Sequence, residues 1–277
     1  MKIKTLITFV LLCVAFGYAN AEPFWDVGLG VENQNNWNRA ARQRGERDDT
    51  LYQADLKYGY SQALSGLSGL LYGVSLERHQ WKKYELLNNT ALETSISYQR
   101  RLLPSLQSPW ISLNGALGYT RYRDPKRRGN QLDLSADVGQ SFTHWQYQAS
   151  AGWKKNSARD EAFSTEASYL TFGAGIKASN SLTLGMGLGF EHGDIVSSGS
   201  IAAAPARFIV KTRDDAFGSL NWQAYRLNAD TLWQELFISY GWKGQHDLRL
   251  AIQAYDSEGR DIDYQGETLS FFYTRLF

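Results

Sequence analysis

Four histidines are the side chains best suited to proton transfer near neutral pH in this chain of 277 residues: His79, His144, His192 and His246. His79 follows Ser75 on the same alternating face, and His192 lies near Asp194, so either imidazole has a neighbour with which a nucleophile or a base could be built. No metal-ligand spacing, phosphate loop or nucleotide-binding motif accompanies them. We therefore expect no enzyme activity, with a lipid-modifying enzyme as an alternative hypothesis.

A second set of charged residues alternates with apolar ones. In the stretch LYQADLKYGY, Asp55 and Lys57 fall between Ala54, Leu56 and Tyr58. Residues in such positions are candidates for lining an aqueous interior: Asp55, Lys57, Glu93, Asp133, Asp137, Arg207, Lys211, Glu235 and Arg249. The acids Asp133 and Asp137 are distant in sequence from Arg207 and Lys211, so opposed acidic and basic walls that orient dipolar solutes are one interpretation. The other is that the charges pair and stiffen the interior.

The elements that carry these residues follow a period of two. From Trp25 onward, apolar side chains recur at every second position in segments of about ten residues, as in WDVGLGV, which is typical of β-strands with unlike faces. A soluble sandwich and a barrel with lipid outside both fit this alternation. Aromatic residues near strand ends favour the barrel: Trp25, Tyr60, Tyr98, Trp110, Tyr119, Trp145, Trp153 and Trp242.

The connections also favour the barrel because short ones alternate with long ones. KASN, SFTH and KGQH are short, whereas residues 33 to 49, 79 to 89, 191 to 204 and 257 to 265 are predicted as long loops. Mean hydropathy is −0.41, and no apolar run beyond the first twenty-one residues approaches the roughly 20 residues of a membrane helix. Hydropathy alone would therefore miss a membrane protein whose strands alternate.

The first twenty-one residues are predicted to be a secretory signal peptide, cleaved after Ala21. MKIK is cationic, TLITFVLLCVAFGY is apolar, and Ala19 and Ala21 are small residues suited to a cleavage site. Residues 22–277 would then form one domain without cysteine, because Cys13 is the only one in the chain. Cleavage of the signal peptide would remove Lys2 and Lys4. The mature chain would then be nearly neutral, so we expect no general electrostatic attraction for nucleic acid.

The last residues, TLSFFYTRLF, carry the resemblance that assigns a class. Phe277, preceded at alternating positions by Tyr273, Phe271 and Leu269, resembles the end of Gram-negative outer-membrane β-barrel proteins of the porin-like class. Arg275 departs from that pattern, although an arginine can snorkel from the membrane interface. The resemblance implies outer-membrane localisation, contact with outer-membrane lipid, and recognition of the terminal Phe277 by the barrel assembly machinery.

The strand count completes the prediction. We predict a transmembrane antiparallel up-and-down all-β barrel of about fourteen strands, with twelve as the alternative. This count includes PARFIVKTR as a strand, followed by strands at 216 to 226, 231 to 243, 247 to 256 and 266 to 277. Such a ring is wider than side chains alone fill. We therefore expect a channel for passive diffusion of small hydrophilic solutes, without a cofactor.

Two loop features add further hypotheses. The stretch RYRDPKRRGN supplies basic residues that could bind lipopolysaccharide phosphates: Arg121, Arg123, Lys126, Arg127 and Arg128. The first hairpin, with ENQNNWNRAA, RDD and LYQADLKYGY, is similar to the opening of the barrel in surface lipoprotein assembly modifiers. That resemblance implies assembly or export of surface lipoproteins or other cargo as an alternative function, although those proteins carry helical repeats that this chain lacks.

Overall fold

The protein is described by a computed structural model covering residues 21–36, 38–39, 46–200, 210–218, 222–259 and 262–277. Residues 1–20 of the predicted signal peptide lie outside the described residues, so the signal peptide and its cleavage site remain predictions. Among the described residues, no helix is long and apolar enough to cross a membrane.

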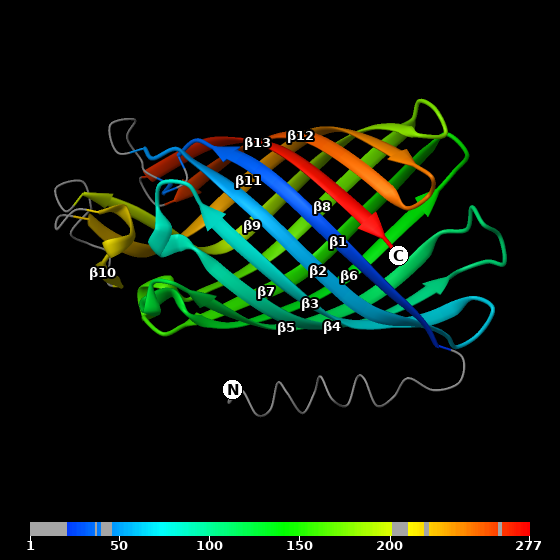
Figure 1. Ribbon diagram of the computed structural model, residues 1–277, viewed down its shortest axis with the longest axis horizontal. Helices are drawn as coiled ribbons and strands as arrows, with labels where there is room; N and C mark the ends of the chain where they lie inside the picture. The colour runs from blue at the N-terminus through cyan, green and yellow to red at the C-terminus, as the bar shows by residue number, and fades with distance from the viewer. Residues whose placement is uncertain (1–20, 37, 40–45, 201–209, 219–221, 260–261) are drawn as a thin grey trace.

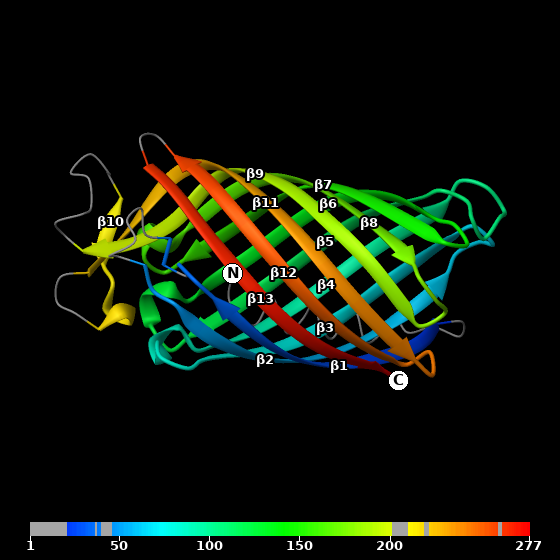
Figure 2. The same cartoon turned by 90° about the horizontal axis from the view of Figure 1, so that it is seen from above.

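Twelve antiparallel strands form one closed ring (Figures 1 and 2). Each strand pairs with the next along the chain, β9 pairs with β11, and β13 pairs with β1. The ring strands are β1 (Ala21–Gln34), β2 (Asp49–Ala63), β3 (Ser68–Trp81), β4 (Asn89–Arg101), β5 (Trp110–Tyr122), β6 (Gly129–Ser141), β7 (Trp145–Ala158), β8 (Thr165–Lys177), β9 (Leu182–Ser200), β11 (Trp222–Trp242), β12 (His246–Gly259) and β13 (Ile262–Leu276). The up-and-down barrel predicted from the alternation is confirmed.

Short elements occupy the connections outside the ring. The three-residue strand β10 (Lys211–Arg213) pairs only with β11 among the described strands. Single turns of 3-10 helix lie at η2 (Glu85–Leu87), η3 (Pro125–Arg127), η4 (Glu161–Phe163) and η5 (Asp215–Phe217). These elements follow β3, β5, β7 and β9, so they gather at one end of the barrel.

The ring contains twelve strands, the alternative given above, and with β10 the described strands number thirteen, near the count of about fourteen. The segments read as strands at 216 to 226 and 231 to 243 are largely one strand, β11, which runs without interruption through residues 227 to 230. Of PARFIVKTR, residues 205–209 lie outside the described residues, and only Lys211–Arg213 is strand. The predicted loops at 191 to 204 and 257 to 265 are also mostly strand where described, because β9 extends to Ser200 and β12 to Gly259.

The two faces of the ring differ in chemistry. One row of each strand carries exposed large apolar side chains, such as Leu113, Leu236 and Ile252, which lie on the outside of the barrel. The alternate row points to the interior and is rich in Gly, Ser, Gln and acidic residues. Trp110, expected among the outer aromatic residues, is an exception because its register with Gly139 places it on the inner row. An apolar outer surface of this extent suits hydrocarbon rather than water.

The barrel has a loop end and a turn end. The connections after β1, β3, β5, β7, β9 and β12 lie at the loop end, on the left of Figure 1 together with β10. The turn end carries the start of β1, the C-terminus and tight connections such as Trp242 to Gln245 between β11 and β12. In that turn Lys243 and Gly244 both have positive φ, the combination that matches strand twist in a two-residue hairpin turn.

The chain ends form the seam that closes the ring. The Phe277 N–H donates to the Trp25 carbonyl at 2.8 Å, and the two aromatic rings stack with centroids 3.9 Å apart. The Arg275 guanidinium lies 4.2 Å from the Phe277 ring centroid, so an outward-facing arginine is accommodated here by an aromatic face. The terminal aromatic row therefore lies on the outer surface, where it covers the seam.

We predict that Leu236→Arg lowers the free energy of unfolding from lipid bilayers by about 2–4 kcal/mol, because it places a charge on the outer surface near mid-barrel. Leu236 is 69% exposed, and its register partner is Ile252. The measurement is denaturant unfolding of protein refolded into vesicles. Gln253→Arg, one position along on the inner row, is the control and should change the free energy far less. Equal effects of the two substitutions would contradict the assignment of the faces.

Candidate functional site: the barrel interior

The strand register places most of the predicted lining residues on the inner row. Asp55 pairs with Gly28 and Glu77, and Asp133 pairs with Ala116 and Lys154. By the same register, the inner row contains Asp55, Lys57, Glu93, Asp133, Asp137, Glu235 and Arg249. Lys211 lies in β10, outside the ring, so it does not belong to the barrel wall. Arg207 lies outside the described residues.

Acidic residues outnumber basic ones on the inner row. Away from the strand ends, the described acids are Asp26, Glu32, Asp55, Glu77, Glu93, Asp133, Asp137, Glu191, Glu235 and Asp247. The corresponding bases are Lys57, Lys154 and Arg249. The sequence reasoning missed several of these, including Asp26, Glu77, Lys154 and Glu191. Applying the same alternation to every residue of every strand would have identified these four residues as inner-row residues.

Two of the three inner bases are neutralised by acids, one on the adjacent strand and one two strands away. The Lys154 Nζ lies 2.6 Å from the Glu191 Oε2, and the Arg249 guanidinium donates to Glu235 while stacking over the Phe237 ring. The interpretation of opposed acidic and basic walls is therefore wrong for the described part of the barrel, because Lys211 is outside the ring and Arg249 is paired. What remains is an excess of negative charge.

Hydrogen bonds hold two of the acids in place on the wall formed by β5 and β6. Asp137 accepts from the Asn114 Nδ2 at 2.7 Å and from the Ser112 Oγ at 2.9 Å. Asp133 accepts from the Tyr169 hydroxyl at 3.0 Å. Neutral donors stabilise a carboxylate without cancelling its charge. These acids therefore contribute a fixed negative field to the interior.

A cavity of about 350 Å³ lies on the inner side of strands β7 to β12. Polar side chains including Gln146, Gln148 and Glu235 line it together with the rings of Trp233 and Phe237. Glycines on β9 make room for these rings, since a Cβ at Gly185 would lie 2.1 Å from Phe237 and one at Gly189 would lie 2.1 Å from Trp233. The interior is thus polar, with aromatic surfaces on the wall opposite β3 to β5.

The loop end is covered by a segment that crosses the mouth of the barrel. We call residues 210–218, which follow β9 in the chain, the crossing segment. They contact the loops after β3 and β5, although β3 stands diametrically opposite β9 in the ring. The Arg127 Nη2 lies 2.7 Å from the Asp214 Oδ2, and Asp214 is 0% exposed. Residues 210–218 therefore lie across the opening instead of extending outward.

Polar contacts from strand β9 and from the loop after β5 converge on the crossing segment. The Asp214 carboxylate also accepts from the Ser198 hydroxyl of β9 and from the Ala216 N–H. The Lys126 Nζ donates to the Arg213 carbonyl at 2.6 Å and to the Asp215 Oδ2 at 3.0 Å. This hydrogen bond, with the positive charges of Lys126 and Arg213, holds the pKa of the Asp215 carboxyl below its ordinary value. The stabilisation is therefore present at neutral pH and is lost only as the pH falls through that lowered pKa.

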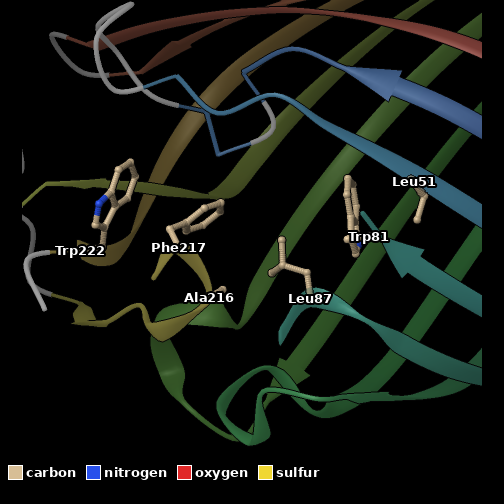
Figure 3. Close-up of a cluster of buried hydrophobic side chains, with 6 residues drawn as sticks. All are labelled: Leu51, Trp81, Leu87, Ala216, Phe217 and Trp222. Atoms are coloured by element: carbon tan, nitrogen blue, oxygen red, sulfur yellow. The ribbon is translucent and has the colours of Figure 1, made fainter. Parts of the chain in front are cut away.

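An apolar cluster accompanies these polar contacts (Figure 3). Phe217 of the crossing segment packs between Trp222 and the side chains of the β3–β4 region, and its ring lies 4.9 Å from that of Tyr84. The buried members are Leu51, Trp81, Leu87, Ala216, Phe217 and Trp222. Burial of large apolar side chains stabilises such a contact by about 1.5–3 kcal/mol each. The crossing segment is thus docked by apolar packing as well as by charge.

The described residues that follow β1 also fold inward. The Asn38 Nδ2 donates to the Ser198 carbonyl at 2.8 Å, the Ser197 hydroxyl donates to the Arg39 carbonyl, and the Tyr255 hydroxyl donates to the Asn36 carbonyl at 2.9 Å. A smaller cavity of about 210 Å³ lies between this connection and the crossing segment, and Asn38, Arg127 and Phe217 are among its lining residues. Described residues of two connections therefore lie over the loop end.

The two histidines considered for catalysis have acidic neighbours. The His192 Nδ1 lies 2.6 Å from the Asp230 Oδ1, which differs from the Asp194 suggested by sequence, and both side chains are exposed on the outer row. The His79 Nε2 lies 3.9 Å from the Glu77 Oε2. Among the described residues, no hydrogen bond connects either imidazole to a serine hydroxyl. The geometry thus provides a base–acid pair at each position without a nucleophile.

Comparisons with known proteins agree with the barrel. No family model matches the sequence, and no curated protein matches it significantly. Solved structures do match: an outer membrane channel from Pseudomonas putida F1 has a TM-score of 0.60 and 11% identity, with 94% of this chain and 97% of that chain covered. The NanC porin has a TM-score of 0.50 and 8% identity over 90% of this chain and 98% of that chain. This protein has the fold of Gram-negative outer-membrane β-barrels.

Proposed function

We propose that this protein is an outer-membrane channel through which small hydrophilic solutes diffuse passively. The observation that carries the proposal is the closed ring of twelve strands, with an apolar outer row and a polar inner row that encloses a cavity. A ring of this size leaves space that inner side chains do not fill. The structural likeness to a channel and a porin supports this function by analogy of fold.

The inner charges favour cations among the solutes. Acidic side chains predominate on the inner row, and Lys154 and Arg249 are already paired with acids. In a narrow passage with low-dielectric walls, fixed negative charge raises the local concentration of cations and lowers that of anions. The proposed solutes are therefore small, hydrophilic and neutral or positively charged.

We predict that the protein, refolded and inserted in planar bilayers, gives step currents with a reversal potential of cation-selective sign in a salt gradient. Replacing Glu93→Gln together with Asp133→Asn should lower the cation-to-anion permeability ratio about twofold or more, because both carboxylates lie on the inner row. Glu166→Gln is the control, since Glu166 lies on the outer row and pairs with Lys155.

The two parts of this prediction fail in different ways. Anion preference, or an unchanged ratio in the double variant, would contradict the charge assignment. The channel function would be contradicted if the protein folds into a heat-modifiable barrel but gives no step currents. This holds whether the crossing segment covers the mouth of the barrel or has moved away from it.

We also propose that lipopolysaccharide contacts the outer surface near the loop end. Of the loop cations suggested for this role, Arg123, Lys126 and Arg127 are paired with carboxylates, so they are engaged within the protein. Arg121 is better placed: it lies in register with Thr90 of β4, and Arg78 of β3 lies in register with the same residue. Both arginines are exposed on the outer row, a pair suited to an anionic phosphate group.

We expect Arg78→Ala combined with Arg121→Ala to reduce the binding of purified lipopolysaccharide to the refolded protein about threefold or more. Arg123→Ala is the matched control, because Arg123 lies at the same end and pairs with Glu85. The measurement is titration of lipopolysaccharide in detergent, with a tryptophan fluorescence readout. Retained binding in the double variant would show that these arginines are not the contact.

We further propose that the barrel assembly machinery recognises the C-terminal row ending in Phe277. The Phe277 ring lies on the outer surface, stacked on Trp25, and is 40% exposed. Phe277→Ala should therefore reduce the amount of folded protein in the outer membrane of cells several-fold while refolding in detergent still succeeds. Leu276→Ala, which alters the adjacent inner-row residue, is the control. Normal assembly of the Phe277 variant in cells would exclude this role.

A further inference from the structure

The crossing segment obstructs the route that the proposed function requires. It lies over the loop end, whereas the cavity inside the barrel is lined by residues of the wall strands. A solute that enters from the loop side must pass residues 210–218 or wait until they move. The contacts that dock this segment are therefore candidates for controlling passage.

We propose that the Arg127–Asp214 ion pair is a latch that holds the crossing segment over the mouth, and that its release opens the channel at the loop end. This inference rests on the proposed channel function. Arg127 belongs to the loop after β5, and Asp214 belongs to the connection after β9, so the pair joins these two parts of the rim beside the contacts of Lys126 with Arg213 and Asp215.

The pair is more buried than the other ion pairs of the rim, apart from the longer Arg127–Asp124 contact within the loop after β5. The side chain of Asp214 is 0% exposed and that of Arg127 is 14% exposed, whereas Lys83 and Asp48 are 49% and 72% exposed. A buried charge that loses its partner is strongly destabilised, whereas an exposed one is solvated by water. Separation of Arg127 and Asp214 would thus strongly favour movement of the segment to a position where water reaches the carboxylate.

Arg127 is itself held in position by neighbours from two loops. Its guanidinium lies over the Phe163 ring of η4, 4.1 Å from the centroid, and its Nε lies 3.5 Å from the Asp124 Oδ2. The anchoring side of the latch is therefore fixed to the barrel rim. The movable side is the crossing segment, which is attached to β11 through β10 over only three residues.

The test compares Arg127→Ala, Asp214→Asn and the double variant with the unmodified protein. One readout is single-channel conductance in planar bilayers. The other is the distance between spin labels on Lys82→Cys and Lys211→Cys, which are exposed residues at the rim and in β10. Asp214→Asn preserves an oxygen that can accept from the Ala216 N–H, so the local turn is retained. Lys83→Ala is the control, because it removes an exposed cation at the same end.

We expect each single variant to raise the mean conductance or open probability at least threefold and to broaden the distance distribution. The double variant should add little beyond either single change, because both remove the same contact. Lys83→Ala should leave both readouts unchanged.

The outcomes separate the latch from the channel. Unchanged distances and conductance in Arg127→Ala and Asp214→Asn would overturn the latch even if the unmodified protein conducts. Additive effects in the double variant would also overturn it, since the two residues would then act independently. Broadened distances without current in any variant would support the latch and contradict the channel function instead.

Discussion

Hydrocarbon offers no water to a peptide group, so every strand in this fold needs a hydrogen-bonded neighbour on both sides. The ring satisfies this requirement only because β13 returns to β1 in register, from Asp26 paired with Leu276 to Gln34 paired with Thr268. The seam joins residues at opposite ends of the chain, and the stacked rings of Trp25 and Phe277 cover its last hydrogen bonds. Closure determines which row of every strand faces inward, and hence the composition of the interior.

The alternation of side chains allowed much of this fold to be predicted from the sequence. Residues such as Leu29, Leu134 and Leu236 lie outside, as the alternation predicts. A register shift of one residue would exchange every outer side chain for an inner one, so the apolar row strongly specifies the register. The same rule placed Asp55, Glu93 and Asp137 on the inner row. Trp110 was misplaced because aromatic residues near strand ends were grouped together as outer residues, although the outer positions of Ile111 and Leu113 put residue 110 on the inner row.

The difference between about fourteen predicted strands and the twelve of the ring arises where strands extend beyond the apolar band. Asn228 and Asp230 looked like part of a turn, yet they pair with Asp194 and His192 in an uninterrupted ladder between β9 and β11. Polar residues on the outer row are acceptable there because that part of the hairpin lies beyond the apolar band. The crossing segment could not be predicted either, since Arg127 and Asp214 are 87 residues apart and no local pattern connects them.

Because the two rows face different surroundings, the residues that stabilise the barrel in the membrane differ from the residues that a solute would meet inside the barrel. Outer-row residues interact with lipid, whereas inner-row residues interact with one another, with water and with solute. Loop residues such as Asp214 and Phe217 belong to neither row and are packed against other loops. The position of the rim segments can therefore change without breaking the strand ladders that keep the ring closed. An arrangement in which the mouth moves while the wall remains fixed fits this separation, because the wall is held by backbone hydrogen bonds, whereas the Arg127–Asp214 contact is made by side chains.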